Sequence, residues 1–361
     1  MISVAFCIDD KFAPYAAVSV ISILSNTKSF VNIYFIGNLS EGVREKLLTL
    51  KNDRSAMVFV AHNLPLSTMP LSDRYVERLN KITFVRYAIA EVLTKLDKVI
   101  YLDADVLVCG DIKRLWEQPL KKSYVGAVLD HSLMSQKRHI TLSLKSKSYF
   151  NAGVLLVDLK IWRDRRIFQY LSRTHNTRER WEYNDQDVLN VVLDEKVQYL
   201  GADMNVQTYS LKHINIKEPL IVHFTGQEKP WHTSSVHPYK DQYRVFLKSV
   251  PFKNNRLSLY LDKEDRTILA RLNAQFENGG NLIVWGAGAR GRRIIKAIEQ
   301  EFPAIVIKQV VDTYLIGKCF SYPIVSPENM TIEAIDAVVV ATLPHKQDIR
   351  NLLRDKALTV I

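Results

Sequence analysis

Short apolar segments alternate over about the first 250 residues with longer segments in which apolar residues recur every three to four positions. Continuous apolar runs between polar residues are typical of buried strands, and the longer period is typical of amphipathic helices. We predict strands at 2–8, 31–36, 56–60, 98–102, 124–129 and 154–157. We predict helices at 13–25, 41–50, 83–93, 161–174 and 185–193. This alternation predicts an α/β fold with a Rossmann-like mixed sheet flanked by helices.

The pattern breaks near residue 252, where Pro251 and the polar residues after it interrupt the alternation. A polar segment with helical spacing follows, from Leu257 to Phe276, and it ends at a pair of glycines. A new strand–helix pattern then begins at Leu282. We therefore predict three parts: a large domain at 1–252, a helical connector at 253–280 and a small Rossmann-like α/β domain at 281–361.

A Gly-X-Gly-X-X-Gly turn lies between the strand and the helix that open the small domain. Its glycines are Gly286, Gly288 and Gly291, and a second strand, 306–311, ends in Asp312. This context is typical of a dinucleotide-binding turn. The domain also resembles the nucleotide-sugar-binding domains appended to bacterial sugar acyltransferases and methyltransferases. The same glycines equally suit tight strand–helix packing, so a second nucleotide site and a structural role both stay open.

The charge and composition of the chain limit the partners and the location that we expect for it. The chain has 361 residues and a net charge of +11, most of it before residue 255. Such an excess favours a phosphorylated substrate or an anionic membrane surface, although a solvated polar face is the alternative. No aromatic-interleaved basic motif accompanies it, so we expect no nucleic-acid partner. Without an apolar run of about 20 residues or a signal-peptide start, we expect a cytoplasmic protein, with peripheral association at the inner face of the membrane as an extension.

Two aspartates directly follow the predicted strand 98–102. Asp103 and Asp105 are separated only by Ala104. At the carboxyl end of a strand in an open α/β sheet, side chains project into the crevice where ligands bind. Two carboxylates there can share Mg²⁺ or Mn²⁺, and the ion can bridge to substrate phosphates. An isolated Asp-X-Asp is also common in turns and caps, so the pair needs support from other segments.

Four further segments place polar residues beside the ends of predicted strands and helices. They are Asp9-Asp10 with Tyr15 after the first strand, Asn151-Ala152-Gly153, Asn184-Asp185-Gln186-Asp187, and the run from His223 to His232. With the aspartate pair, their order and spacing resemble glycosyltransferase family 8 over about residues 2–246. That family includes bacterial lipooligosaccharide galactosyltransferases and glycogenin. The resemblance implies a GT-A fold and a metal-dependent transfer of a hexose from a UDP-sugar.

The resemblance also implies a role for individual residues. The metal ligands are Asp103, Asp105 and His223. The nucleotide, diphosphate and hexose of the donor are contacted by Asp9, Asp10, Tyr15, Arg86, Ala104, Asn151, Ala152, Gly226, Lys229 and His232. Gln186 and Asp185 are the candidates for catalysis at the sugar. Family 8 enzymes retain the anomeric configuration, and the matching position is Gln186, whose amide is a poor nucleophile. We therefore favour a front-face attack in which Gln186 supports the oxocarbenium-like state.

Several alternatives stay open at this stage. Asp10 can cap the helix that follows it, Arg86 and Lys229 can be solvated surface residues, and Asp187 can be purely structural. A rival enzyme is an NAD(P)-dependent oxidoreductase built on the C-terminal glycines, and a non-catalytic rival is a nucleotide-sugar sensor. The sequence does not fix whether the donor sugar is galactose or glucose. It also leaves open which glycan or lipid-linked saccharide accepts it.

Overall fold

The computed structural model describes residues 1–62, 81–178, 181–252, 257–342, 346–354 and 358–361. The chain divides into two compact units. The first comprises Met1–Gln227 and His237–Asn255, and the second comprises Glu228–Val236 and Arg256–Ile361. The boundary predicted from sequence adjoins residues 253–256, which lie outside the described residues.

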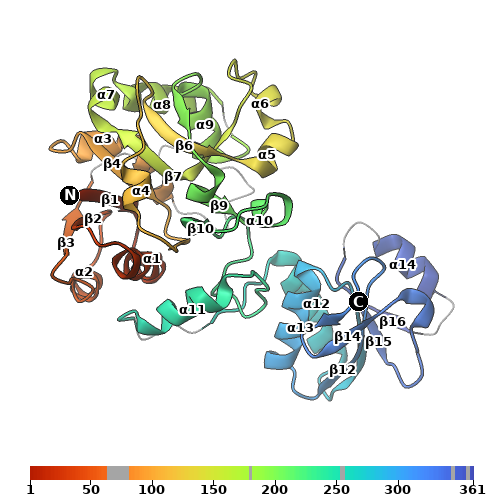
Figure 1. Cartoon of the computed structure of the whole chain (residues 1–361). Helices are drawn as coiled ribbons and strands as arrows, with labels where there is room; N and C mark the ends of the chain where they lie inside the picture. The colour runs from red at the N-terminus through yellow and green to blue at the C-terminus, as the bar shows by residue number, and fades with distance from the viewer. Residues whose placement is uncertain (63–80, 179–180, 253–256, 343–345, 355–357) are drawn as a thin grey trace. The chain divides into compact units, whose positions relative to one another are not determined.

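A seven-stranded sheet forms the centre of the first unit, with strand order β3-β2-β1-β4-β7-β6-β8 (Figure 1). Its strands are β1 (Ile2–Cys7), β2 (Val31–Ile36), β3 (Ser55–Val60), β4 (Lys98–Leu102), β6 (Val125–Leu129), β7 (Phe150–Asp158) and β8 (Val197–Tyr199). Strands β1 to β4 run parallel, and β7 is antiparallel to both of its neighbours. This mixed sheet with flanking helices confirms the predicted fold class.

A smaller sheet in the same unit has the order β5-β10-β9. Its strands are β5 (Val106–Val108), β9 (Val206–Gln207) and β10 (Ile221–His223). Because β4 ends at Leu102 and β5 begins at Val106, the chain passes from the large sheet to the small one through the two aspartates.

Thirteen helical segments in the described part of this unit surround the two sheets. They are α1 (Ala13–Asn26), α2 (Glu41–Leu48), η2 (Lys81–Ala88), α3 (Ile89–Val92), α4 (Lys113–Trp116), α5 (His131–Ser135), α6 (Arg138–Thr141), α7 (Leu159–Asp164), α8 (Ile167–His175), α9 (Asn184–Val192), η3 (Ala202–Asn205), α10 (Ser210–His213) and α11 (Lys240–Ser249). The helix predicted at 83–93 is mostly a 3₁₀ helix. The one predicted at 161–174 is interrupted at Arg166, whose φ of 53° is left-handed.

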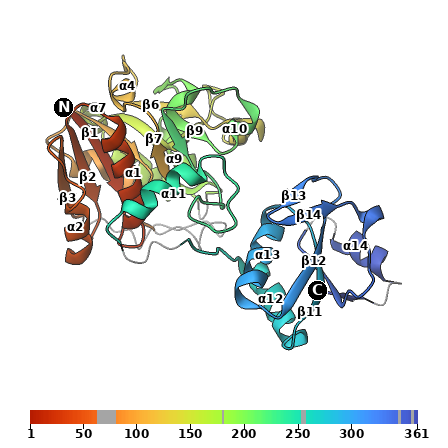
Figure 2. The same cartoon turned by 60° about the horizontal axis from the view of Figure 1, so that its bottom comes forward.

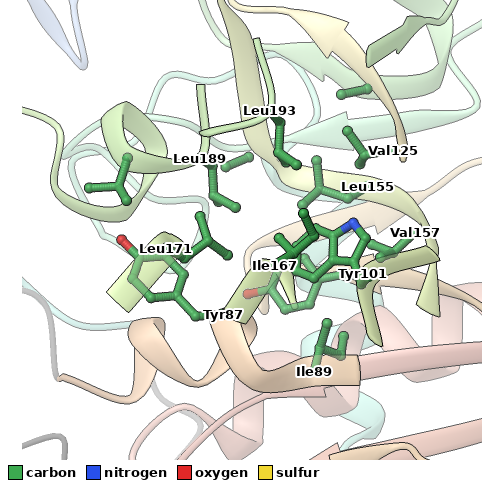
Figure 3. Packing of buried hydrophobic residues seen from close by; sticks show 14 of the residues in the cluster. Tyr87, Ile89, Tyr101, Val125, Leu155, Val157, Ile167, Leu171, Leu189 and Leu193 are labelled. Carbon is green, nitrogen blue, oxygen red and sulfur yellow. The ribbon is translucent and has the colours of Figure 1, made fainter. Parts of the chain in front are cut away.

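The main core lies between the large sheet and helices α8 and α9 (Figure 3). Leu171 of α8, Leu189 of α9 and Leu193, which directly follows α9, belong to the same buried cluster as Tyr101 and Leu155 of the sheet. Each buried leucine stabilises the fold by about 1.5–3 kcal/mol through removal of apolar surface from water. This packing gives the ends of β4 and β7 a rigid support.

The second unit contains a six-stranded sheet of order β13-β14-β12-β11-β15-β16. Its elements are β11 (Gly280–Trp285), β12 (Ile305–Val311), β13 (Lys318–Cys319), β14 (Tyr322–Val325), β15 (Ala337–Val340), β16 (Thr359–Val360), α12 (Lys263–Gln275), α13 (Ala289–Glu301), η4 (Pro327–Asn329) and α14 (Lys346–Leu353). Leu282 and Val284 of β11 cluster with α12 and α13, whereas Ile283 and Trp285 cluster with α14. Helices α12 and α13 lie on one side of this sheet and α14 lies on the other (Figure 2). The sheet is therefore covered on both faces, as in a doubly wound fold.

Within the described residues, helices long and apolar enough to span a lipid bilayer are absent.

Candidate active site

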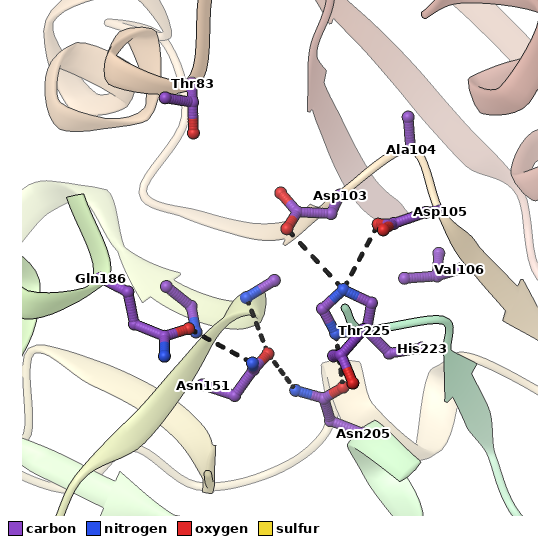
Figure 4. Close-up of polar contacts among 12 residues, drawn as sticks. Thr83, Asp103, Ala104, Asp105, Val106, Asn151, Gln186, Asn205, His223 and Thr225 are labelled. Atoms are coloured by element: carbon purple, nitrogen blue, oxygen red, sulfur yellow. Dashed lines mark hydrogen bonds and ion pairs between the residues drawn. The ribbon is translucent and has the colours of Figure 1, made fainter. Parts of the chain in front are cut away.

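Two carboxylates and one imidazole meet where the large and small sheets join. Strand β10 runs antiparallel to β5 with His223 opposite Val106, which brings the imidazole beside the aspartates that precede β5. His223 Nε2 lies 3.3 Å from Asp105 Oδ1 and 3.8 Å from Asp103 Oδ2 (Figure 4). One ligand atom from each of the three residues lies within 4.8 Å of the others. Two hard carboxylate oxygens and one imidazole nitrogen are a suitable donor set for Mn²⁺ or Mg²⁺.

A chain of hydrogen bonds fixes which nitrogen of His223 carries the proton. Asn151 Oδ1 accepts from the backbone N–H of Gly153 at 3.0 Å, which identifies that atom as the amide oxygen. It also accepts from Asn205 Nδ2 at 3.0 Å, so Asn205 turns its own oxygen toward His223 Nδ1, 3.1 Å away. In the neutral imidazole, Nδ1–H is then the donor, and the lone pair of Nε2 faces the two carboxylates. In that form the three electron-rich atoms would repel one another, and a bound cation would remove the repulsion.

Gly153 leaves the space that the imidazole occupies. A Cβ at this position would lie 2.1 Å from His223 Cε1 and 2.7 Å from Asp103 Oδ2, closer than side chains approach one another. The backbone of Gly153 also accepts a hydrogen bond from Asp103 N at 2.8 Å. Only a residue without a side chain allows β7 to approach the cluster so closely.

Arg86 lies between two carboxylates. Its Nη2 donates to Asp103 Oδ1 at 2.9 Å, and its Nε lies 3.0 Å from Asp185 Oδ2. Nη1 donates to the carbonyl of Ala152 at 2.8 Å, and the guanidinium lies over the ring of Tyr101. Burial raises the pKa of Asp185 to about 6, although the neighbouring guanidinium lowers it. Arg86 is therefore a buried cation paired with two carboxylates, and the solvent-facing position left open from the sequence is wrong.

Gln186 belongs to a second polar group beside the cluster. Its Oε1 accepts from Ala152 N at 2.9 Å and from Asn151 Nδ2 at 3.2 Å, and its Nε2 donates to Asp130 Oδ2 at 3.1 Å. Asn151 Nδ2 also donates to Asp130 Oδ2. The side chain of Gln186 is thus held in one orientation by strand β7 and by the carboxylate that follows β6.

The chain matches one family over most of its length. The sequence profile described as glycosyl transferase family 8 covers residues 3–235. The chain belongs to glycosyl transferase family 8. The resemblance drawn from the five motifs is therefore confirmed.

Relatives within family 8 include enzymes of lipopolysaccharide synthesis. Lipopolysaccharide 1,2-glucosyltransferase of Escherichia coli (strain K12) is 28% identical over 273 residues, which cover 70% of this chain and 80% of that protein. Lipopolysaccharide 1,3-galactosyltransferase of Salmonella typhimurium (strain LT2) is 26% identical over 266 residues, covering 68% and 77%. The crystal structure of galactosyltransferase LgtC in complex with donor and acceptor sugar analogs matches with a TM-score of 0.63 at 24% identity, covering 74% of this chain and 99% of that chain. This likeness confirms the GT-A fold.

The residues expected to contact the nucleotide in this family 8 chain lie at the start of α1. Asp9 Oδ1 accepts from Phe12 N, and Asp10 Oδ1 accepts from Ser40 N, both at 3.0 Å. Asp10 therefore does not cap α1, whose N-cap is Phe12 and has no side-chain cap. Burial raises the pKa of the Tyr15 hydroxyl, which stays protonated at neutral pH.

Asp187 makes buried contacts that stabilise the fold. Its side chain is fully buried, accepts from Arg138 Nε at 3.0 Å and from the Tyr149 hydroxyl at 2.8 Å, and also satisfies the N–H of Tyr183. It therefore ties α9 to α6 and to the residue directly before β7, which agrees with the structural alternative drawn from the sequence.

Lys229 and His232 lie in the other compact unit. The run from His223 to His232 crosses from the first unit to the second after Gln227. Gly226, just before the crossing, has a φ of +89°, a conformation that only glycine adopts without strain. The structure thus brings Asp103, Asp105, His223, Arg86, Asn151, Ala152, Asp185 and Gln186 together in one unit.

Sequence reasoning missed several residues of the site. Asn205, Asp130, Tyr101 and Gly153 each contact a predicted site residue and were assigned no role. Asp130 could have been found, because it follows the predicted strand 124–129 just as Asp103 follows 98–102. Asn205 carries no local signal.

Residues of the glycine-rich turn in the second unit make close contacts with their local surroundings. Gly286 has a φ of +114°, and a Cβ on Gly291 would overlap the carbonyl oxygen of Gly286. Asp312 Oδ2 accepts from Ala287 N at 2.7 Å, and Oδ1 accepts from Tyr314 N and Leu315 N at 2.9 Å. These contacts account for two of the three glycines and for both oxygens of Asp312.

Proposed function

We propose that this chain is a hexosyltransferase that moves galactose or glucose from a UDP-sugar to a glycan or lipid-linked saccharide, with retention of anomeric configuration and with Mn²⁺ or Mg²⁺. One observation carries the proposal: three ligand atoms of Asp103, Asp105 and His223 lie within 4.8 Å of one another, with Nε2 of the imidazole turned toward the carboxylates. Membership of glycosyl transferase family 8 supports it.

The negative charge on the departing UDP determines the roles that we propose for the donor-binding residues. The cation supplies neutralisation of the diphosphate when it is bound. Arg86, itself held by Asp103 and Asp185, adds a fixed positive charge beside it. We assign the diphosphate also to Gly226, Lys229 and His232. The uridine is assigned to Asp9, Asp10, Tyr15 and Ala104.

At the hexose, the contacts favour Gln186 over Asp185 as the group beside the anomeric carbon. Asp185 is held by the Arg86 ion pair and by the hydroxyl of Thr83, so its carboxylate is engaged rather than offered as a nucleophile. Gln186 Oε1 is fixed by hydrogen bonds from Ala152 N and Asn151 Nδ2, and its partial negative charge can stabilise developing positive charge without breaking them. We therefore propose front-face attack, with Asn151 and Ala152 orienting the sugar.

The acceptor and the location follow from charge and from the relatives. Two relatives are named for transfer to lipopolysaccharide, which supports a lipid-linked or cell-surface glycan as the acceptor class. A net charge of +11 supports a cytoplasmic enzyme working at the anionic inner face of the membrane.

A donor-hydrolysis assay tests this function without knowledge of the acceptor. The full chain is incubated with UDP-galactose or UDP-glucose and Mn²⁺, and released UDP is measured with and without EDTA. We expect hydrolysis of one donor, its loss in EDTA, and its restoration by added Mn²⁺. Asp105→Asn should abolish it, whereas Asp97→Asn, which alters an exposed carboxylate ahead of β4, should not. Turnover that persists in EDTA would refute the metal role, and absence of release from every UDP-sugar would refute the donor class.

A further inference from the structure

The run that supplies the donor-phosphate residues is divided between the two compact units. His223 lies in the first unit, whereas Lys229 and His232 lie in the second, within the segment Glu228–Val236. Only four residues separate His223 from Glu228, and one of them is the left-handed Gly226. The 228–236 segment therefore takes its conformation from the C-terminal unit.

Backbone hydrogen bonds hold the 228–236 segment in that unit. Ser258 N donates to the carbonyl of Trp231, and Thr233 N donates to the carbonyl of Ser258, both at 2.9 Å. His232 N donates to the carbonyl of Lys229 at 3.0 Å, which closes a turn around the lysine. The turn is thus fixed on one side by residues that follow the predicted domain boundary.

The imidazole of His232 is oriented from two directions. Its Nδ1 accepts from Lys229 N at 3.2 Å, so the neutral ring carries its proton on Nε2 and offers a hydrogen-bond donor there. Its ring stacks on Tyr260, with centroids 5.5 Å apart and planes 12° apart. Tyr260 in turn lies under the guanidinium of Arg293 in α13.

An ion pair ties the start of the segment to the same helix. Arg292 Nη2 of α13 lies 2.9 Å from Glu228 Oε2, and both side chains are largely buried. Glu228 Oε1 accepts from Val236 N at 3.1 Å, which joins the two ends of the segment. Helix α13 therefore contacts Glu228 at the start of the segment that carries Lys229, and through Arg293 and Tyr260 it supports His232 in the middle of that segment.

We propose that the C-terminal unit positions the donor-diphosphate residues, with Arg292, Glu228 and Tyr260 as positioning residues for Lys229 and His232. This rests on the proposed function, because it assumes that these two side chains meet the diphosphate of a UDP-sugar. The small Rossmann-like unit then contributes to transfer by preorganising a cationic turn. Preorganised donors at a diphosphate cost no reorganisation when charge develops.

Arg292→Met in the full chain tests the proposal against a matched control. The Lys296–Glu299 pair has similar exposure, and both of its members belong to α13 itself, so Lys296→Met is the control. UDP affinity in saturating Mn²⁺ is measured by calorimetry, and donor KM and kcat are measured by hydrolysis. We expect Arg292→Met to weaken UDP binding and to raise donor KM about fivefold or more, with Mn²⁺ affinity in the absence of UDP unchanged. Lys296→Met should match the wild type.

A second variant keeps the test valid if Arg292→Met folds poorly. Glu228→Gln retains an oxygen that can accept from Val236 N but cannot form the ion pair, and we expect it to raise donor KM in the same direction. Donor KM in both variants equal to that of Lys296→Met would overturn the positioning role. If the wild-type chain itself binds no UDP, the proposed function fails instead, so the two failures are distinguishable.

Discussion

Adding one methyl group at Gly153 should disable the ligand cluster without altering any ligand. The added Cβ would meet His223 Cε1 at 2.1 Å, and ordinary contact begins at 3.4 Å, so the imidazole has to shift by more than 1 Å. Metal–ligand distances tolerate only about 0.2 Å of error. A misplacement of 1 Å can cost about 100-fold in rate, and we expect a loss of that size in both Mn²⁺ affinity and donor hydrolysis for Gly153→Ala.

Mn²⁺ affinity of the variant can be titrated by electron paramagnetic resonance, with hydrolysis of the UDP-sugar as the second measurement. Gly42→Ala is the matched control, because a Cβ there meets open space on helix α2. Thermal denaturation establishes that the variant is folded, since overpacking itself costs about 1–3 kcal/mol. If folded Gly153→Ala binds Mn²⁺ within about threefold of the wild type, the inferred geometry of the imidazole and carboxylates is wrong.

Three further predictions test other contacts. Asn205→Leu removes the acceptor of the imidazole proton, and a Mn²⁺ titration should show affinity reduced about 10- to 100-fold, whereas equal affinity would show that the ring needs no such support. Asp187→Asn removes the buried one of the two carboxylates that pair with Arg138, leaving only the more exposed Glu182, and chemical denaturation should show a loss of about 3 kcal/mol in free energy of unfolding. A loss below about 1 kcal/mol would contradict the structural role. Gln186→Ala should lower kcat for donor hydrolysis about 100-fold, and retention of most turnover there, with its abolition in Asp185→Asn, would contradict front-face attack.

Local pattern predicts the large sheet well because its strands are continuous apolar runs. The predictions for β2 and β4 coincide with their observed bounds, and the βαβ start of the second unit is found as expected. The pattern misses the break at Arg166, because apolar spacing continues across it while one residue takes a left-handed conformation. Periodicity reports which face is buried and does not report backbone dihedral angles.

The candidate site is only partly readable from sequence, for a related reason. Asp103 and Asp105 can be predicted because they follow a strand. His223 joins them only because β10 pairs with β5, and these two strands are far apart in the sequence. The resemblance to family 8 supplied that residue, since no spacing rule does. Asn205 acts through contacts made after the sheets assemble, so nothing in its neighbourhood marks it. Gly153 belongs to a predicted motif, but its close approach to His223 arises only from the assembled sheets.

The hydrogen bonds on Asp103 have a consequence for ion selectivity. Its Oδ1 accepts from Arg86 Nη2 at 2.9 Å and from the Tyr101 hydroxyl at 2.7 Å, which leaves Oδ2 as the oxygen turned toward His223. The carboxylate can then bind an ion through one oxygen only. Calcium requires six to eight oxygen ligands and commonly takes carboxylates through both oxygens. We therefore expect a site with one imidazole nitrogen and a carboxylate blocked on one side to favour smaller cations over calcium.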